Sequence, residues 1–306
     1  MTPAEIGAIE AALDERVVTW RNLAGGYSHE TCAVELASGS VVVRLGGGSP
    51  AIEAEVMRLA GAHVPVPRVR QTRESTSAEV RPFMVIDHVE GVALSEVLES
   101  GGAADDLESL GVAVAEVSLR IGAVTVATRP GFFSDSELCV PHERPWSQQL
   151  PEVAAQCMAR TPDERLDAAT RAAWVELCTN RAPRLAAIDD QARLVHSDFN
   201  PKNILVTRIG DGWRVASVLD WEFAYSGCRY ADAGNMLRHA AEYPPAYVGG
   251  FRAGYARGVH VDAEWAYLGA VIDMFALSEL VTRRDVHPVA DLAAGRIKAL
   301  LAGASA

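Results

Sequence analysis

Two short polar loops carry the residues of this sequence that are best suited to chemistry. The first loop holds His196, Asp198 and Asn203 between two apolar runs, and the second follows the next apolar run and holds Asp220 and Glu222. A polar loop between two buried strands has side chains that the core does not use. A carboxylate in such a loop can accept the proton of a hydroxyl group. An amide and a second carboxylate can supply the oxygen ligands that Mg²⁺ prefers.

The order and spacing of these residues indicate phosphoryl transfer. His196, Asp198 and Asn203 follow the pattern H-x-D-x-x-x-x-N. Protein kinases use that spacing for a carboxylate that accepts the substrate hydroxyl proton and an asparagine that binds magnesium. Asp220 stands where kinases place a metal-binding aspartate. We therefore predict Asp198 as the catalytic residue and Asn203 and Asp220 as ligands of Mg²⁺, although each alone is also an ordinary turn former.

Three neighbouring residues could support these groups in more than one way. His196 is expected to brace the loop through hydrogen bonds, because kinase chemistry assigns the work to the aspartate. Lys202 either reaches the transferred phosphate as a point charge or is a solvated lysine. Glu222 either assists the metal and the substrate or caps the next turn.

A second set of candidate residues lies near the amino terminus and is expected to bind the nucleotide. Arg44 closes an apolar strand, and a charge there needs a partner or a phosphate. Glu53, on the following helix, is the preferred partner for Arg44, with Glu55 as the alternative. Gly25, Gly26 and Ser28 form a turn whose backbone amides can approach a phosphate, although such a turn also serves a simple hairpin.

The hydrophobic pattern predicts an α+β fold with a small antiparallel β-rich lobe and a larger, mainly helical lobe. The lobes are expected at residues 1–87 and 92–306, with a connector at 88–91. Periods of two and 3.6 residues separate strands from helices. Strands are expected near residues 17–20, 31–36, 41–45 and 83–86, and helices at 3–16, 52–62, 104–122 and 164–189 and over most of the chain after 232. A stretch rich in proline and aromatic residues, 130–151, is expected to connect two of these helices.

Composition narrows the classes of partner. The formal net charge of −12 argues against a nucleic-acid backbone as partner and is compatible with a cationic substrate or with simple solubility. No apolar stretch approaches the roughly 20 residues of a membrane helix, and the first residues lack the pattern of a secretory signal. The five cysteines are dispersed and fit reduced thiols. These features predict a cytoplasmic protein that does not bind membranes.

The two polar loops resemble those of the aminoglycoside phosphotransferase family, which comprises antibiotic and small-molecule kinases. The motifs His-Ser-Asp-Phe-Asn-Pro-Lys-Asn at 196–203 and Leu-Asp-Trp-Glu at 219–222 carry the resemblance. It extends to the segments 43–45, 53–56 and 64–67 and to Asp232. Two departures are mild: Ser197 stands where glycine is commoner, and Arg44 stands where some members have lysine.

The resemblance implies a protein-kinase-like fold with ATP or GTP in the cleft between the lobes. The base of the nucleotide would contact backbone groups of Asp87 and Val89. The acceptor would be a hydroxyl of an aminoglycoside, a macrolide, a basic cyclic peptide such as capreomycin or viomycin, choline, homoserine or a sugar. The sequence leaves open which of these is the substrate, and whether the protein is a monomer or a homodimer.

We take a cationic antibiotic as the preferred acceptor. A site that binds such a cation must supply carboxylates. The candidates for that role are Glu222, Asp232, Asp273 and Glu279. Asp273 and Glu279 lie in an otherwise apolar helical segment, where a carboxylate needs a partner, a cleft or the solvent. The alternatives are a macrolide kinase or a metabolic small-molecule kinase with the same fold and, last, a nucleotide-binding protein without catalysis.

Overall fold

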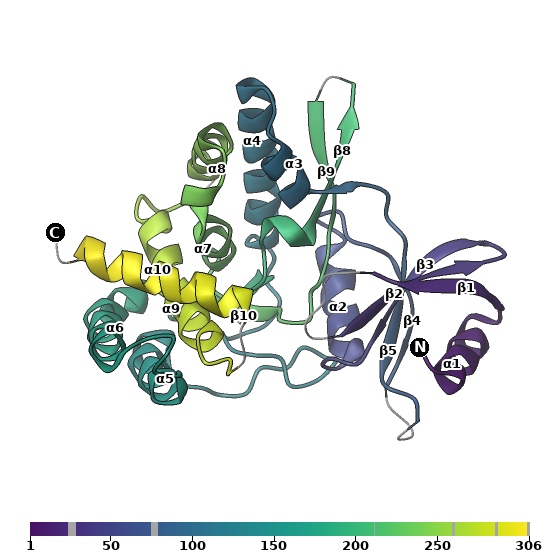
Figure 1. Cartoon of the computed structure of the whole chain (residues 1–306), viewed down its shortest axis with the longest axis horizontal. Coiled ribbons are helices and arrows are strands. Elements are labelled where there is room, and N and C mark those ends of the chain that lie inside the picture. The colour runs from purple at the N-terminus through teal and green to yellow at the C-terminus, as the bar shows by residue number, and fades with distance from the viewer. Residues whose placement is uncertain (24–28, 75–78, 211, 259–260, 285–286, 305–306) are drawn as a thin grey trace.

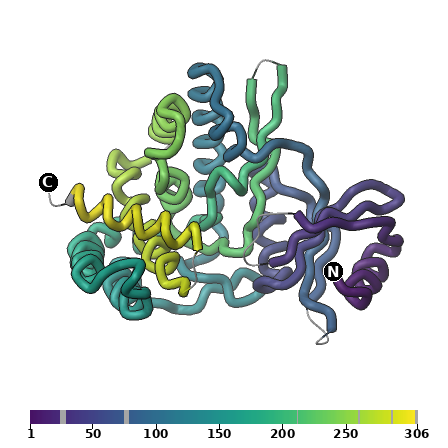
Figure 2. The backbone as a smooth tube through the Cα atoms, in the orientation of Figure 1, coloured from purple at the N-terminus to yellow at the C-terminus, as the bar shows by residue number. Residues whose placement is uncertain are grey.

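The computed structural model describes residues 1–304 except 24–28, 75–78, 211, 259–260 and 285–286. It has two lobes, a small β-rich amino-terminal lobe and a larger helical lobe, as Figure 1 shows. The backbone trace in Figure 2 passes from one lobe to the other after the last strand of the first sheet. The predicted α+β architecture of a small β-rich lobe and a larger helical lobe is therefore confirmed.

The amino-terminal lobe is built on a five-stranded antiparallel sheet with the order β1-β2-β3-β5-β4. Its strands are β1 (Val17–Asn22), β2 (Glu30–Leu36), β3 (Gly39–Leu45), β4 (Val69–Arg73) and β5 (Phe83–Asp87). β-branched residues favour the central strand β3, and Val41 and Val43 pack into a core with Phe83 and with Ile9 of α1 (Pro3–Leu13). This sheet fixes the position of Arg44 at the end of β3.

Helix α2 (Pro50–Ala60) lies between this sheet and the large lobe (Figure 1). The side chain of Ser49 caps its first turn, and Pro50 occupies a first-turn position where a missing N–H costs nothing. Val56 and Met57 are buried in a hydrophobic cluster with Met84 and Ile86 of β5, which continues into the large lobe, and Glu53 is buried on the same helix. The hydrophobic face of α2 therefore sets the position of Glu53.

The large lobe contains most of the helices and two small sheets. Its α-helices are α3 (Leu94–Ser100), α4 (Ala104–Ile121), α5 (Trp146–Arg160), α6 (Ala168–Arg181), α7 (Ala231–Leu237), α8 (Pro245–Ala256), α9 (Trp265–Leu280) and α10 (Pro288–Ala304). Its strands are β6 (Val92–Ala93), β7 (Arg193–Val195), β8 (Ile204–Ile209), β9 (Gly212–Val218) and β10 (Tyr225–Gly227). None of the helices in the described part of the chain is long and apolar enough to cross a membrane.

The two small sheets hold the two polar loops. Strand β7 leads into the first loop, and β8 and β9 form the hairpin between the loops. Strand β10 then pairs antiparallel with β7, so that Tyr225 lies opposite Val195. The segments before the first loop and after the second loop are thus neighbours.

Helices α7 and α9 pack backbone to backbone beneath the first loop. A Cβ atom on Gly234 would lie 2.1 Å from the carbonyl oxygen of Gly269, so only glycine fits there. Asp232 and Asp273 lie on these two helices. Their positions therefore depend on this close contact.

Two expectations for the helical region were wrong in detail. The segment expected to connect two helices contains the beginning of α5, in which Pro151 is tolerated because a buried stripe including Trp146, Leu150 and Ala154 anchors the helix. Tertiary burial therefore outweighs the cost of a proline inside the helix. The helix expected at 164–189 is the shorter α6, followed by a 3₁₀ turn at Ala182–Ala187.

Candidate active site

Asp198 lies in the loop between β7 and β8, where two asparagine side chains hold its carboxylate. The side-chain amide of Asn200 donates to its Oδ1 at 2.8 Å, and that of Asn203 donates to its Oδ2 at 2.7 Å. Asn203 also donates to the backbone carbonyl of Asp198 at 3.0 Å. Because amides that donate to a carboxylate fix its orientation without neutralising it, Asp198 is suited to accept a hydrogen bond from a substrate hydroxyl.

His196 is fully buried and connects the two loops. Its Nε2 lies 2.8 Å from the backbone carbonyl of Leu219, and its Nδ1 accepts the backbone N–H of Asp198 at 3.2 Å. An acceptor at Nδ1 and a carbonyl at Nε2 require the neutral ring with its proton on Nε2. The ring of Trp221 packs against it, with centroids 4.5 Å apart. The geometry thus agrees with a bracing role for His196.

Asp232 fixes the backbone of the first loop through hydrogen bonds to its carboxylate. Its Oδ2 accepts the backbone N–H of His196 at 3.0 Å, and its Oδ1 accepts that of Ser197 at 2.9 Å. Burial raises the pKa of this carboxyl, although the two backbone N–H donors act in the opposite direction. Because Asp232 is buried and both its oxygens are used by the backbone, it is not available to an acceptor, contrary to the sequence-based expectation.

Asp220 stands at the start of the second loop, with a backbone φ of +65° and a half-buried side chain. Its Oδ1 accepts a hydrogen bond from Nη2 of Arg44 at 2.5 Å. Burial acts to raise the pKa of this carboxyl, but the nearby His29 and Arg44 outweigh it, and the pKa is lowered. Asp220 is therefore a carboxylate at neutral pH, with one face toward the amino-terminal lobe.

Arg44 contacts one carboxylate from each lobe. Its guanidinium contacts Glu53 on α2 and Asp220 on the second loop. Glu53 also accepts the backbone N–H of Trp221 at 3.1 Å, and burial raises its pKa. Glu55, the alternative partner, bonds Arg58 on the surface of α2.

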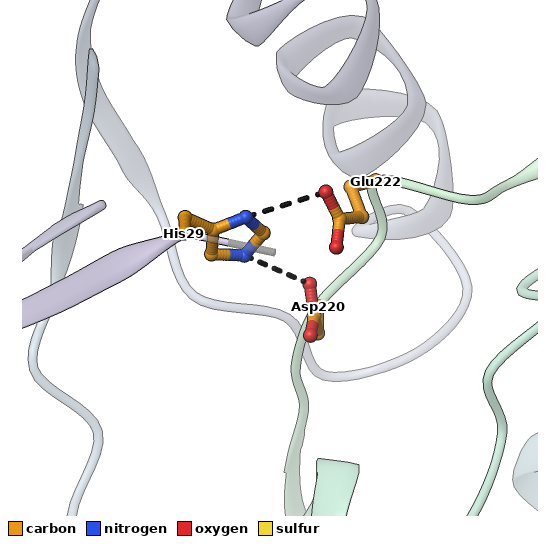
Figure 3. A group of neighbouring side chains, drawn as sticks. All are labelled: His29, Asp220 and Glu222. Carbon is orange, nitrogen blue, oxygen red and sulfur yellow. Dashed lines mark ion pairs between the residues drawn. The ribbon is translucent and has the colours of Figure 1, made fainter. Parts of the chain in front are cut away.

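His29, which the sequence reasoning missed, belongs to the same cluster. Its two ring nitrogens face Glu222 and Asp220 (Figure 3), and only 5% of its side chain is exposed. Burial acts against protonation, but hydrogen bonds to the two carboxylates raise the pKa of the ring from 6.5 to about 9. The available sequence signal was its position directly after the glycine-rich turn; only the structure brings it to residues nearly 200 positions away.

The remaining predicted nucleotide-binding residues lie outside the described part of the chain or make few contacts with the site. Gly25, Gly26 and Ser28 lie outside the described residues. The Asp87 backbone N–H donates to the carbonyl of Arg68, so that only its carbonyl remains for a base. Val89 follows two residues later in the connector. Lys202 is exposed, with its backbone N–H on the side chain of Asn200.

The acidic residues expected to bind a cationic acceptor are mostly engaged elsewhere. Asp273 is buried and receives two hydrogen bonds from Arg238, at 2.9 and 2.6 Å. Glu222 faces His29, and Glu279 is exposed on α9. Buried charges need partners, and in Asp273 and Glu222 the partners are groups of this chain. The expected substrate role of Asp273 is therefore not supported.

The donor set near Asp220 fits a hard dication. The amide nitrogen of Asn203 is used by Asp198, which leaves its carbonyl oxygen for a metal. Asp220 and Glu222 add carboxylate oxygens, and together with His29 they form a group whose ligand atoms lie within 4.8 Å of one another. Oxygen ligands of this kind suit Mg²⁺. The basic side chains of Arg44 and His29 pair with these carboxylates in the structure, so a dication would replace their positive charge.

Comparisons with known proteins also indicate a phosphotransferase. Residues 19–269 match the family model described as the phosphotransferase enzyme family. Among curated proteins, a 218-residue segment is 29% identical to acyl-CoA dehydrogenase family member 10 of Mus musculus. That match covers 68% of this chain and spans about a fifth, 19%, of the length of the mouse protein.

Solved structures share the fold over the whole chain. The crystal structure of a thermostable mutant of aminoglycoside phosphotransferase APH(4)-Ia, in ternary complex with ADP and hygromycin B, matches with a TM-score of 0.74 and 18% identity, over 100% of both chains. A putative fructosamine-3-kinase from Thermobifida fusca matches with a TM-score of 0.64 and 18% identity, also over 100% of both chains. At these identities, the likeness establishes the fold alone.

Proposed function

The chain belongs to the phosphotransferase enzyme family, and on that premise we propose that it is an O-phosphotransferase that transfers the γ-phosphoryl group of ATP or GTP to a hydroxyl of a small molecule. The observation that carries this proposal is the joining of the two polar loops. Asn203 holds the Asp198 carboxylate, and its backbone carbonyl accepts the N–H of Leu219, directly before Asp220. A proton acceptor and a carboxylate suited to a metal are thereby fixed to one another.

In the proposed mechanism, Asp198 accepts the hydrogen bond of the attacking hydroxyl. The new bond forms between the acceptor oxygen and the γ-phosphorus, the bond from that phosphorus to the nucleoside diphosphate breaks, and the hydroxyl proton passes to Asp198. The transition state is loose, so positioning and charge stabilisation supply most of the rate. Bound Mg²⁺, held by Asn203 and Asp220, would neutralise phosphate charge. Arg44, held by Glu53 through Nη1, would turn Nη2 from Asp220 to the phosphates.

We propose an acceptor that contains a sugar ring. An aromatic cluster of Phe132, Trp146, Tyr225 and Phe275 lies beside strand β10. Tyr225 pairs with Val195, three residues before Asp198, and Phe132 is 54% exposed. Trp146 and Tyr225 are buried beneath it, so Phe132 is the ring that this cluster exposes, and an exposed aromatic ring offers an apolar face with a fixed geometry to a ligand ring. An aminoglycoside, as in the hygromycin B complex of the structural relative, and a fructosamine both meet this requirement.

The charge of the acceptor distinguishes these candidates. A polycationic aminoglycoside or basic cyclic peptide needs free carboxylates, whereas three of the four expected ones have partners within this chain. The net charge of −12 still favours cations near the surface. We keep the cationic antibiotic as the first candidate and a fructosamine or other metabolic sugar derivative as the second.

A transfer assay tests this proposal. Purified protein with Mg²⁺ and either ATP or GTP would be incubated with hygromycin B, other aminoglycosides, capreomycin, viomycin, a macrolide, a fructosamine, choline and homoserine. We expect one class to yield a phosphorylated product that is absent with the Asp198→Ala variant. A resistance panel in a sensitive bacterium would separate antibiotic from metabolic acceptors. Nucleotide binding without transfer to any of these would favour a non-catalytic protein.

A further inference from the structure

One imidazole and two carboxylates from different lobes meet beside the phosphate-binding region. His29 Nδ1 lies 3.3 Å from Oε2 of Glu222, and Nε2 lies 3.4 Å from Oδ1 of Asp220 (Figure 3). His29 immediately precedes β2 in the small lobe, whereas the two carboxylates belong to the second polar loop of the large lobe. The side chains of His29 and Glu222 are 5% and 7% exposed.

The cluster borders a small polar cavity. The cavity has a volume of about 10 Å³, and its lining includes His29, Arg44, Glu53 and Glu222. This is about the room that one water molecule requires. The loop after β3 closes it from one side: Gly47 has a φ of +83°, and a Cβ there would lie 2.9 Å from His29 Nδ1 and 3.3 Å from Glu222 Oε2. Gly47 therefore packs against the contact between the His29 ring and Glu222, where a larger residue would not fit.

We propose that His29, Asp220 and Glu222 bind a first-row transition-metal dication before the nucleotide arrives, with His29 as a nitrogen ligand from the small lobe. Each side chain offers one ligand atom, and all of these atoms lie within 4.8 Å of one another. Ligands at about 2.0–2.2 Å from one ion have comparable separations, so small side-chain rotations complete the site. Imidazole nitrogen favours transition metals, whereas Mg²⁺ prefers an all-oxygen set.

Arg44 contacts two of the proposed ligands and must release them before a metal can bind. Its Nη2 bonds Asp220 and contacts the His29 ring, while its Nη1 contacts Glu53. An incoming dication replaces the Nη2 contacts and one ring proton of the His29 imidazolium, which passes to the solvent, and Arg44 stays anchored by Glu53. The bound ion would then join the lobes through His29, which neither Asn203 nor Asp220 can do from the large lobe alone.

This inference extends the proposed function by adding a nitrogen ligand to its metal site, and a measurement without nucleotide or acceptor separates the two. Nucleotide-free protein would be titrated with Mn²⁺ and followed by electron paramagnetic resonance, with pulsed detection of ¹⁴N coupling. We expect one Mn²⁺ per chain, a ¹⁴N signal from imidazole, and displacement only by a large excess of Mg²⁺.

Two variants and one control complete the experiment. His29→Ala should remove the ¹⁴N signal and weaken Mn²⁺ binding at least about tenfold, the scale of losses seen when groups around a metal are removed. Glu222→Gln should weaken binding while keeping the ¹⁴N signal. His63→Ala, an exposed histidine of the same lobe, should match the unchanged protein. An absent ¹⁴N signal in the unchanged protein, or His29→Ala with unaltered Mn²⁺ affinity, would overturn the proposal, whatever the outcome of the transfer assay.

Discussion

The side-chain amide of Asn203 bonds both the carboxylate and the backbone carbonyl of Asp198, at 2.7 and 3.0 Å. A single asparagine thus orients the proposed proton acceptor and keeps its own carbonyl oxygen for a metal. The backbone carbonyl of Asn203 also accepts the N–H of Leu219 in the second loop. A change at Asn203 is therefore expected to affect both loops.

Removing the Asp198 carboxylate should abolish transfer and spare nucleotide binding. Asp198→Ala is expected to lower kcat by at least about 100-fold, because positioned proton acceptors contribute roughly 10²–10⁴-fold. Nucleotide affinity, measured by calorimetry, should stay close to that of the unchanged protein. Asp190→Ala, at an exposed position, is the control. Turnover that survives in Asp198→Ala would exclude the assigned role.

Changes at the two predicted magnesium ligands should raise the requirement for Mg²⁺. Asp220→Asn and Asn203→Ala each remove or weaken an oxygen ligand of a hard cation. Titration of Mg²⁺ at fixed ATP should show a half-saturating concentration raised by about 10-fold or more in both variants. Asp105→Asn, on an exposed face of α4, serves as the matched control. An unchanged magnesium curve would place the metal elsewhere.

Arg44 and Glu53 should behave as a coupled pair. Because they contact one another in a buried position, the double alanine variant should cost less than the two single variants added, with a coupling of roughly 0.5–3 kcal/mol in kcat/KM. The same cycle with Glu55 should be additive, since Glu55 bonds Arg58 on the surface. Coupling of Arg44 to Glu55 instead of Glu53 would contradict the contact.

Ser197 should tolerate glycine with a gain in stability. Its φ of +73° lies in the left-handed region, which costs a non-glycine residue roughly 1–2 kcal/mol. Glycine loses more chain entropy on folding, roughly 0.5–1 kcal/mol, so Ser197→Gly should raise the free energy of unfolding by up to about 1 kcal/mol. Urea denaturation would measure it. Ser95→Gly, within helix α3, should lower stability by comparison. Destabilisation by Ser197→Gly would show that the serine side chain contributes to the loop.

His29 should make the stability of the metal-free protein depend on pH above neutrality. Asp220 and Glu222 face the ring and raise its pKa from 6.5 to about 9, while burial and Arg44 oppose them. A raised folded-state pKa gives stability that is complete below pH 6.5 and is lost as the pH rises through about 9. After allowance for screening by solvent, we expect a difference of about 1–2 kcal/mol.

The measurement for His29 compares the unchanged protein with His29→Gln in a chelating buffer. The difference in free energy of unfolding between them should shrink from below pH 6.5 to above pH 9. His63→Gln, at an exposed site, should follow the unchanged protein. A constant difference between the two proteins across this range would mean that Asp220 and Glu222 do not raise the pKa of the ring.

Local patterns in the sequence were sufficient for the fold class and for the two polar loops. Alternating and helical periods depend on neighbours within one element, and the spacing of Asp198 and Asn203 lies within one loop. The contact between Arg44 and Glu53 also spans a single connection, so the preference for Glu53 rested on local geometry. Helix α5 escaped prediction because its burial against the rest of the lobe, and not its local propensity, offsets Pro151.

The partners of the acidic residues were decided by the tertiary structure alone. The sequence shows that Asp232, Asp273 and Glu222 are acidic, but it does not show what each of them faces. Asp232 meets backbone donors 35 and 36 positions away, and Asp273 meets Arg238 across two packed helices. His29 reaches Asp220 and Glu222 only because the two lobes close on one another. A buried charge takes whichever partner the packing brings to it, and such contacts between distant segments have no periodic signature in the chain.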